Sequence, residues 1–153
     1  MRLYFAYGAN MNAEVLARRL MRESASFRRR RGVLMNHRLV FNKLSSTDPV
    51  VGYANVVACP GECVEGLLNE LDDGALAQLD AIELVPHHYI RSRLLVHDSL
   101  HGELTPAEIY TAHPRWIRPH LMPLRSYLSH LIDAADLLSE DYARTLRLMR
   151  CRD

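Results

Sequence analysis

Residues 4–10 read YFAYGAN, and the expected fold can be built outward from this stretch. An apolar, aromatic run of strand composition stops at Gly8, Ala9 and Asn10, which together favour a turn. From Asn12 onward the apolar residues recur at helical spacing, and Asn10 or Asn12 can cap that helix. We therefore predict a strand over 2–7, a turn at 8–10 and a helix from residue 12. Aromatic residues carried directly into such a turn raise the question of whether the turn holds a ligand.

The rest of the chain predicts further strands mixed with short helices. Capping residues are expected at Asp72 and Ser139, each just before an apolar helical pattern. The Cys59–Glu62 stretch (CPGE) contains Pro-Gly and predicts the turn of a hairpin. The expected elements are a strand pair over 32–34 and 37–41, a loop over 42–52, strands over 53–58, 64–71, 89–97 and 108–112, and helices over 72–83, 124–138 and 140–149.

This order of elements predicts the α+β class, with a mostly antiparallel sheet rather than a doubly wound one. The chain has 153 residues and shows no internal repeat, low-complexity segment or linker. We therefore expect one domain over residues 1–153.

Composition and charge argue against several classes of protein. Hydrophobic residues make up 48% and charged residues 24% of the chain, as in globular proteins. No apolar run approaches the roughly 18 residues that a membrane span requires, and the start MRLYFAYGAN has no signal-peptide pattern. We expect a cytoplasmic protein without a membrane partner.

The three cysteines are Cys59, Cys63 and Cys151, an odd number that argues against a disulfide framework. A zinc site would need a second Cys or His pair at ligand spacing, and none is present. The eight histidines are scattered, and on a strand His87 and His88 would point to opposite sides. We expect reduced thiols and no metal site.

Positive charge is concentrated near the amino terminus, where residues 1–44 contain ten Lys or Arg and two Asp or Glu. The run Arg28–Arg31 could be a phosphate-binding patch, or a strand whose alternate arginines pair with the acidic remainder of the chain or face water. We favour the second interpretation, and with it no nucleic-acid partner, because no aromatic residues alternate with these arginines. Only one of the 19 cationic residues is a lysine, and we infer no function from that bias.

Residues 79–91 (LDAIELVPHHYIR) contain the clearest candidate for acid–base chemistry. Glu83 lies at the end of a predicted helix between the apolar residues Ile82 and Leu84. The helix dipole and partial burial both disfavour a negative charge there, so the pKa of Glu83 should be raised towards neutrality. A general acid/base needs such a pKa. The alternative is a solvated glutamate at a helix end. We expect Asp80 to be a capping or structural residue.

Taken together, YFAYGANM, GYANVVACPGECVEGLLNEL, the LD-x-x-E motif and a Tyr six residues beyond its Glu resemble the γ-glutamylcyclotransferase-like family. Within that family the resemblance is to AIG2-like, γ-glutamylamine cyclotransferase-like bacterial members. Pro123, Tyr127, Leu128 and Tyr142 resemble its closing helices. The chain contains no G-x-S-x-G, H-E-x-x-H, Walker or G-x-G-x-x-G motif that would indicate another chemistry.

The resemblance implies a small, mostly antiparallel β-barrel with flanking helices. It also implies a cofactor-independent and metal-independent reaction in which a γ-glutamyl amide cyclises to 5-oxoproline and releases its amine. Glu83 would be the catalytic general acid/base. The residues implied for substrate binding are Tyr7, Gly8, Ala9, Asn10 and Tyr89.

Two departures from the family pattern bear on the substrate. The family usually carries Ser at the position of Ala9, and residues 84–88 (LVPHH) lack the glycines of the vertebrate dipeptide-cleaving branch. The leaving group, which could be an amino acid, an amine or part of a γ-glutamylated metabolite, therefore stays open, as does the oligomeric state. Tyr89 could instead be an aromatic residue of the barrel wall. Alternatives to the enzyme are a small-molecule-binding protein of the same fold without turnover, and a different acyl-transfer or lyase reaction in the same pocket.

Overall fold

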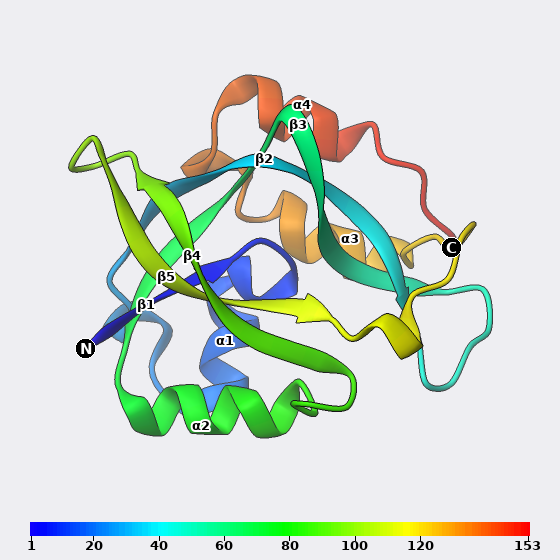
Figure 1. The fold of residues 1–153 in the computed structure, drawn as a ribbon, viewed down its shortest axis with the longest axis horizontal. Coiled ribbons are helices and arrows are strands. Elements are labelled where there is room, and N and C mark those ends of the chain that lie inside the picture. Colours follow the sequence, from blue (N-terminus) through cyan, green and yellow to red (C-terminus); the bar gives the residue numbers. More distant parts are fainter.

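A closed five-stranded β-barrel forms the centre of the computed structural model, which describes all 153 residues (Figure 1). The strand order around the barrel is β1-β3-β2-β4-β5. The barrel closes through a parallel contact between β1 and β5, at Tyr4 and Glu108, whereas every other strand pair is antiparallel. The expected α+β barrel is thereby confirmed. The strands are β1 Arg2–Ala6, β2 Arg29–Leu44, β3 Gly52–Leu71, β4 Tyr89–Asp98 and β5 Glu103–Ala112.

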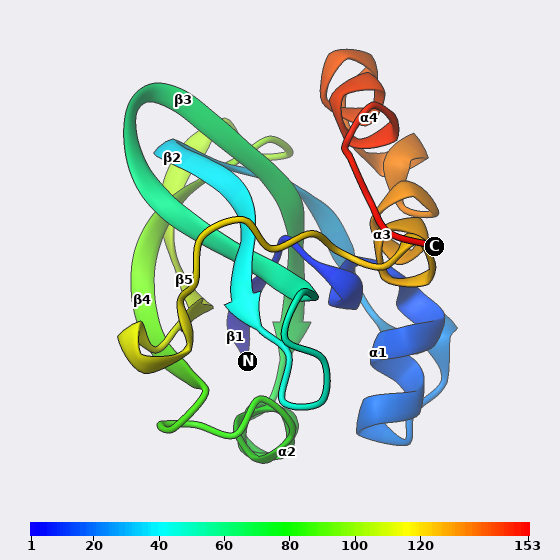
Figure 2. The same cartoon turned by 90° about the vertical axis from the view of Figure 1, so that its right-hand side faces the viewer.

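Four α-helices flank the barrel, and three of them lie along one side of it. Figure 2 shows α1, α3 and α4 stacked beside the strands, with α2 below the barrel. None of the helices has the length and hydrophobicity that crossing a membrane requires. The helices are α1 Ala13–Leu20, α2 Asp73–Ile82, α3 Arg125–Ile132 and α4 Glu140–Arg147.

The predicted helix starts are confirmed. The side chains of Asn12, Asp72 and Ser139 precede α1, α2 and α4, and each accepts a hydrogen bond from a backbone N–H in the first turn of its helix. At α3 the boundary differs, because the helix ends at Ile132 and residues 135–137 form a separate short turn.

The prediction of two separate strands over 32–34 and 37–41 is wrong, and so is the prediction of a hairpin over 53–71. Residues 29–44 form a single strand, β2, and residues 52–71 form a single strand, β3, which pairs with β2 along both of its halves. The Cys59–Glu62 stretch is a bulge opposite Asn36, whose side chain accepts a hydrogen bond from the Gly61 N–H at 3.1 Å. Pro-Gly does mark a reversal of direction in many chains, but here it bends one long strand.

The arginine run confirms the paired interpretation. Arg29–Arg31 lie in β2, and the Nε atom of Arg30 is 2.8 Å from Oδ2 of the buried Asp98. Arg31 donates a hydrogen bond to Ser99 at 3.2 Å. These charges are therefore used within the molecule, to hold β2 against the end of β4.

Close packing between β1 and β3 depends on a glycine. Gly66 in β3 lies against the end of β1, where an added Cβ would be 2.4 Å from the carbonyl oxygen of Ala6 and 2.8 Å from the ring of Phe5. Phe5 is fully buried in the core, together with Leu67 and Leu68 of β3. Gly66 thus fixes how closely β1 approaches β3 immediately before the 8–10 turn.

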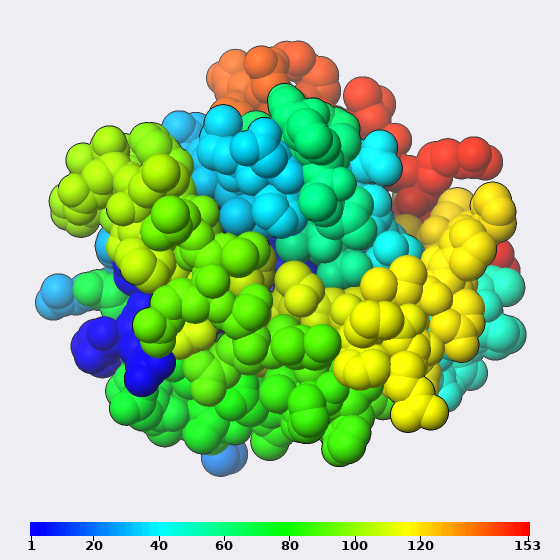
Figure 3. All heavy atoms as spheres, in the orientation of Figure 1, coloured from blue at the N-terminus to red at the C-terminus, as the bar shows by residue number.

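The segment of residues 113–122 covers one side of the barrel beside the ends of β2 and β3. It forms the yellow surface at the right of Figure 3. Within it, Ile117 forms a β-bridge with Lys43, and Met122 forms one with Val51. The loop between β2 and β3 is thereby held against the barrel.

Candidate active site

A cavity of about 310 Å³ opens between the end of β1, the end of α2 and the start of β4. Its wall is unusually rich in tyrosine, because six of the seven tyrosines of the chain line it. Besides these rings the wall carries one carboxylate, two cations and one imidazole. The lining residues are Tyr4, Tyr7, Gly8, Ala9, Asn10, Arg19, Lys43, Ser46, Tyr53, Ala54, Ile82, Glu83, Leu84, His88, Tyr89, Tyr110 and Tyr127.

The structure brings all six predicted site residues to this one cavity, although they come from three separate segments. The turn after β1 contributes four of them, the residue after α2 contributes one, and the first residue of β4 contributes one. What each residue does there stays a prediction. The six are Tyr7, Gly8, Ala9, Asn10, Glu83 and Tyr89.

The turn after β1 is held in shape by a buried asparagine. Residues 9–11 form a single 3-10 turn, and all three are buried. The Asn10 amide donates to Oη of Tyr4 at 2.9 Å, and its Oδ1 accepts from the Arg19 guanidinium at 3.0 Å. These two hydrogen bonds give Asn10 a role in holding the shape of the turn.

Arg29, from the arginine run, holds the same turn from its other side. Its guanidinium donates to the backbone carbonyls of Met11 at 2.8 Å and Asn10 at 3.0 Å, and to Oδ1 of Asn69 at 3.0 Å. One planar group thus connects the turn to β3, a geometry that a shorter or unforked side chain cannot reproduce.

Replacing Arg29 with glutamine should loosen the turn. The loss of this charged donor fork is expected to lower the free energy of unfolding by about 1.5–3 kcal/mol. Amide hydrogen exchange of residues 8–12 should accelerate more than that of α4. The matched control is Arg28→Gln, because Arg28 is exposed and lies outside β2. Equal exchange rates in the two variants would contradict the clamping role.

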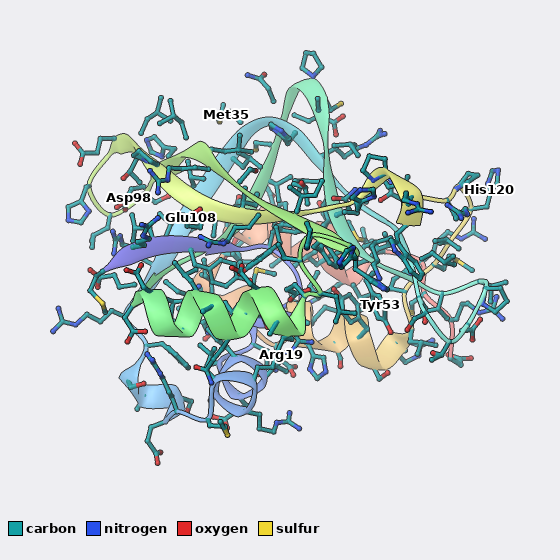
Figure 4. All side chains as sticks on the ribbon, turned by 60° about the horizontal axis from the view of Figure 1, so that its bottom comes forward. Arg19, Met35, Tyr53, Asp98, Glu108 and His120 are labelled. Carbon is teal, nitrogen blue, oxygen red and sulfur yellow. The ribbon has the colours of Figure 1, made fainter.

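Glu83 is the only carboxylate in the cavity wall, and it caps the carboxyl end of α2 as expected. Its side chain is 18% exposed, and its Oε1 atom is 3.3 Å from Nη1 of Arg19. Burial raises the pKa of the Glu83 carboxyl, while the positive charges of Arg19 and Lys43 and a hydrogen bond with Asn10 oppose that shift. Figure 4 shows Arg19 and Tyr53 near this end of α2, whereas Asp98 and Glu108 lie towards the other end of the barrel.

Asp80, one turn before Glu83, has the structural role expected for it. Its carboxylate accepts from Arg91 at 2.8 Å and 3.2 Å and from the Tyr110 hydroxyl at 2.8 Å. These bonds fasten α2 to β4 and β5. Asp80 thereby places the end of the helix, and Glu83 with it, over the cavity.

Three tyrosine hydroxyls of the cavity make hydrogen bonds to the backbone. Two of them donate and one accepts, so only the third keeps its proton free. Tyr89 donates to the carbonyl of Ala54 at 2.9 Å, and Tyr7 donates to the carbonyl of Tyr110. Tyr127 instead accepts, from the N–H of Ala54 at 3.2 Å. Its own proton is therefore available to a molecule in the cavity.

Burial keeps the Tyr127 hydroxyl protonated. Burial raises its pKa to about 12, and the negative charge of Glu83 acts in the same direction. Tyr4, Tyr7 and Tyr89 also have pKa values well above the ordinary value, because they are buried. The cavity therefore presents neutral hydroxyl groups at physiological pH.

Sequence reasoning missed a second polar group in the cavity, built on Lys43. The Nζ atom of this buried lysine is 2.7 Å from Nδ1 of His88. Since an ammonium can only donate, Nδ1 must accept, and the proton of neutral His88 is placed on Nε2. The His88 ring stacks on Trp116 with ring centroids 3.9 Å apart. His87 and His88 lie just before β4, outside the strand.

The missed residues could not be found from local patterns. Lys43, His88 and Trp116 are separated by at least 28 residues along the chain and meet only because β2, the β4 entry and the 113–122 segment come together. The one available signal was the single lysine of a chain whose other cations are arginines.

Chemically, the cavity combines a carboxylate of raised pKa, an available neutral hydroxyl, and cations on more than one side. A carboxylate of this kind can accept and return a proton near neutral pH. Neutral hydroxyls and cations can bind carboxylates and stabilise a developing oxyanion. The arrangement suits proton-transfer chemistry on a small polar molecule that carries negative charge.

Comparison with known families gives a consistent assignment. The family model described as "Gamma-glutamyl cyclotransferase, AIG2-like" matches residues 4–129. The matched region contains the barrel except for the first two residues of β1, and it contains every residue that lines the cavity. Among curated proteins, none matches this chain.

Solved structures share the fold at low sequence identity. A protein named gamma-glutamyl cyclotransferase is 21% identical with a TM-score of 0.85, over 99% of this chain and 89% of its own. An uncharacterized protein from Homo sapiens is 23% identical, also with a TM-score of 0.85 and the same coverage. An AIG2-like protein from Mus musculus is 25% identical with a TM-score of 0.52, over 76% of this chain and 82% of its own.

Proposed function

This chain belongs to the AIG2-like γ-glutamyl cyclotransferase family, and we propose that it converts a γ-glutamyl amide to 5-oxoproline and a free amine. The observation that carries the proposal is the position of Glu83. It is the cavity's single carboxylate, it has a raised pKa, and it shares the cavity with the 8–10 turn. Glu83 is the general acid/base of the proposed reaction.

In this reaction the substrate's own α-nitrogen attacks its γ-carbonyl carbon, and the bond from that carbon to the amide nitrogen breaks. The α-ammonium loses two protons in becoming the lactam N–H, and the leaving nitrogen gains two in becoming an ammonium. Glu83 transfers these protons and ends the turnover as it began. A reference α-amine has a pKa of about 7.7–8.0, so a proton acceptor is needed at neutral pH.

Because the attack is intramolecular, the protein mainly has to hold the glutamyl chain in a ring-closing shape. Well-oriented intramolecular reactions reach effective molarities on the order of 10⁵–10⁸ M. We assign the glutamyl α-carboxylate to the N–H groups of the turn at 8–10. The tight approach at Gly8 fits that role, since an added Cβ would be 3.1 Å from both Ala54 Cβ and Tyr127 Oη.

Tyr127 is the proposed donor to the oxyanion that forms when the γ-carbonyl is attacked. Its hydroxyl accepts the backbone N–H of Ala54 and retains its own proton for the substrate. A donor fixed in advance by such bonds stabilises developing charge without reorganisation. Tyr89 lines the cavity with its hydroxyl bound to Ala54, so we assign it to shaping the wall around the substrate.

The test is direct detection of both products. Purified protein is incubated with γ-glutamyl amino acids, γ-glutamyl amines and glutathione, and 5-oxoproline and the released amine are quantified by mass spectrometry. Equimolar 5-oxoproline and amine, dependent on Glu83, are expected from at least one class. Binding of these compounds without either product would identify a non-catalytic binding protein instead.

A further inference from the structure

Lys43 is a buried cation without a carboxylate partner. The residue is 4% exposed, near the end of β2, and no carboxylate lies within 4.0 Å of its Nζ atom. Buried charges in proteins are normally paired. By contrast, the other cation of the cavity, Arg19, is paired with Glu83 at 3.3 Å.

The surroundings of Lys43 hold the ammonium in place and leave it able to bind an anion. Its Nζ atom lies 4.7 Å from the ring centroid of Trp116, 5.6 Å from that of Tyr89 and 5.7 Å from that of Tyr53. Aromatic faces attract a cation at these distances but do not neutralise it. The ammonium has three N–H donors and uses one of them on His88. The others belong to a side chain that lines the cavity.

Net charge identifies the kind of ligand that would complete this arrangement. With Arg19, Lys43 and an ionised Glu83, the charged groups of the wall sum to +1. A γ-glutamyl amino acid carries two carboxylates and one ammonium and has a net charge of −1. A γ-glutamyl amine lacks the second carboxylate and has a net charge of zero. Only a γ-glutamyl amino acid supplies two carboxylates, one for the 8–10 turn and one for the Lys43 ammonium.

We propose that Lys43 binds a carboxylate on the leaving amine, so that the preferred substrates are γ-glutamyl amino acids rather than γ-glutamyl amines. The inference rests on the proposed function and adds a residue that determines specificity. The 8–10 turn is assigned to the glutamyl half of the substrate, which leaves the side of the cavity lined by Lys43 and His88 for the leaving half. The Glu83 carboxylate contacts Arg19 and interacts electrostatically with Lys43. We therefore assign it to proton transfer at both the attacking α-nitrogen and the leaving nitrogen.

The protonation of Lys43 agrees with this role. Burial lowers the pKa of Lys43, and the negative charge of Glu83 opposes that shift. A bound carboxylate would restore the charged form by direct pairing. The site is therefore better suited to a substrate that brings a negative charge than to one that brings a neutral alkyl group.

The test compares γ-glutamyl-alanine with γ-glutamyl-ethylamine, which differ only in the leaving-group carboxylate. For the wild-type protein, kcat/KM is expected to be at least about tenfold higher for γ-glutamyl-alanine. An equal value or a preference for γ-glutamyl-ethylamine would overturn the inference, although turnover of either compound would still support the proposed function. Calorimetric affinities of the Glu83→Gln variant for the two compounds give the same comparison independently of turnover.

Two variants separate the leaving-group role from other roles of Lys43. In Lys43→Met, kcat/KM for γ-glutamyl-alanine should fall at least about tenfold more than that for γ-glutamyl-ethylamine, because any effect on Glu83 is common to both substrates. Equal losses on both substrates would instead place Lys43 at the glutamyl half and overturn the assignment. Arg38→Met, an exposed cation on the same strand, is the matched control and should change neither value. If Lys43→Met does not fold, the substrate preference of the wild-type protein still tests the inference.

Discussion

Glu83→Gln should abolish 5-oxoproline formation while the barrel stays folded. The amide keeps the shape of the carboxylate but can neither accept nor return a proton. Positioned acid–base groups contribute on the order of 10²–10⁴ to the rate, so kcat should fall at least about 100-fold. Substrate affinity should change much less, because the 8–10 turn and Tyr127 are untouched. Single-turnover kinetics together with calorimetry measure the two quantities separately.

The same substitution should also change stability, with a sign set by linkage. Burial raises the folded-state pKa of Glu83 above its unfolded value, so the ionised carboxylate is disfavoured in the fold. The wild-type protein therefore loses stability as pH rises from the unfolded pKa to the folded pKa. Glutamine has no such titration, so the Tm of the variant should equal or exceed that of the wild type above this window. The difference should shrink at acid pH.

The matched control is Glu103→Gln, an exposed glutamate at the start of β5. It makes the same chemical change away from the cavity and should leave both activity and the pH dependence of stability unchanged. Residual activity of Glu83→Gln within tenfold of wild type would remove Glu83 from the reaction. A uniform loss of Tm at every pH would instead show that Glu83 supports the fold.

Gly66→Ala should strongly destabilise the barrel. The new Cβ would lie 2.4 Å from the backbone oxygen of Ala6, so β1 and β3 would have to separate. Overpacking of this kind costs about 1–3 kcal/mol, or more where only backbone can move. For a chain of this size each kcal/mol lowers Tm by about 2–4 °C. The shift would also displace the turn that follows β1, so KM should rise as well.

Gly74→Ala is the control, because it makes the same change with the opposite expected sign. Gly74 lies in the exposed first turn of α2, where an added Cβ meets only Oδ1 of Asp72, at 3.4 Å. Alanine is the better helix former, so this variant should be stabilised by up to about 1 kcal/mol. Denaturant unfolding of both variants is sufficient. Equal stabilities would show that β1 can accommodate a side chain at position 66.

The parts of the structure that could be predicted are those that short segments determine alone. Helix starts are predictable at Asn12, Asp72 and Ser139, because each of these side chains accepts a hydrogen bond from a backbone N–H no more than three residues ahead. The end of α2, with Glu83 as its C-cap, is predictable for the same reason, since an apolar helical pattern stops there and Pro86 follows. The α+β class then followed from the order of the elements.

The parts that could not be predicted depend on which segment pairs with which. The Cys59–Glu62 sequence is typical of a hairpin turn, yet the segments on either side of it pair with β2 and not with each other. No local pattern indicates which segments pair. The clamp from Arg29 onto the 8–10 turn and the meeting of Lys43 with His88 have the same origin. These contacts form between residues far apart in the sequence when the barrel closes, so no short segment predicts them.

Trp116 gives the protein an optical reporter of its own. It is the only tryptophan of the chain, and its indole ring stacks on His88 and lies over the Lys43 ammonium. Emission excited at the red edge of the indole band therefore comes from one place, beside the cavity. A molecule that pairs with Lys43 or changes the charge of His88 alters the field at that ring. Ligands can thus be sought by fluorescence on the unlabelled protein, before any product is known.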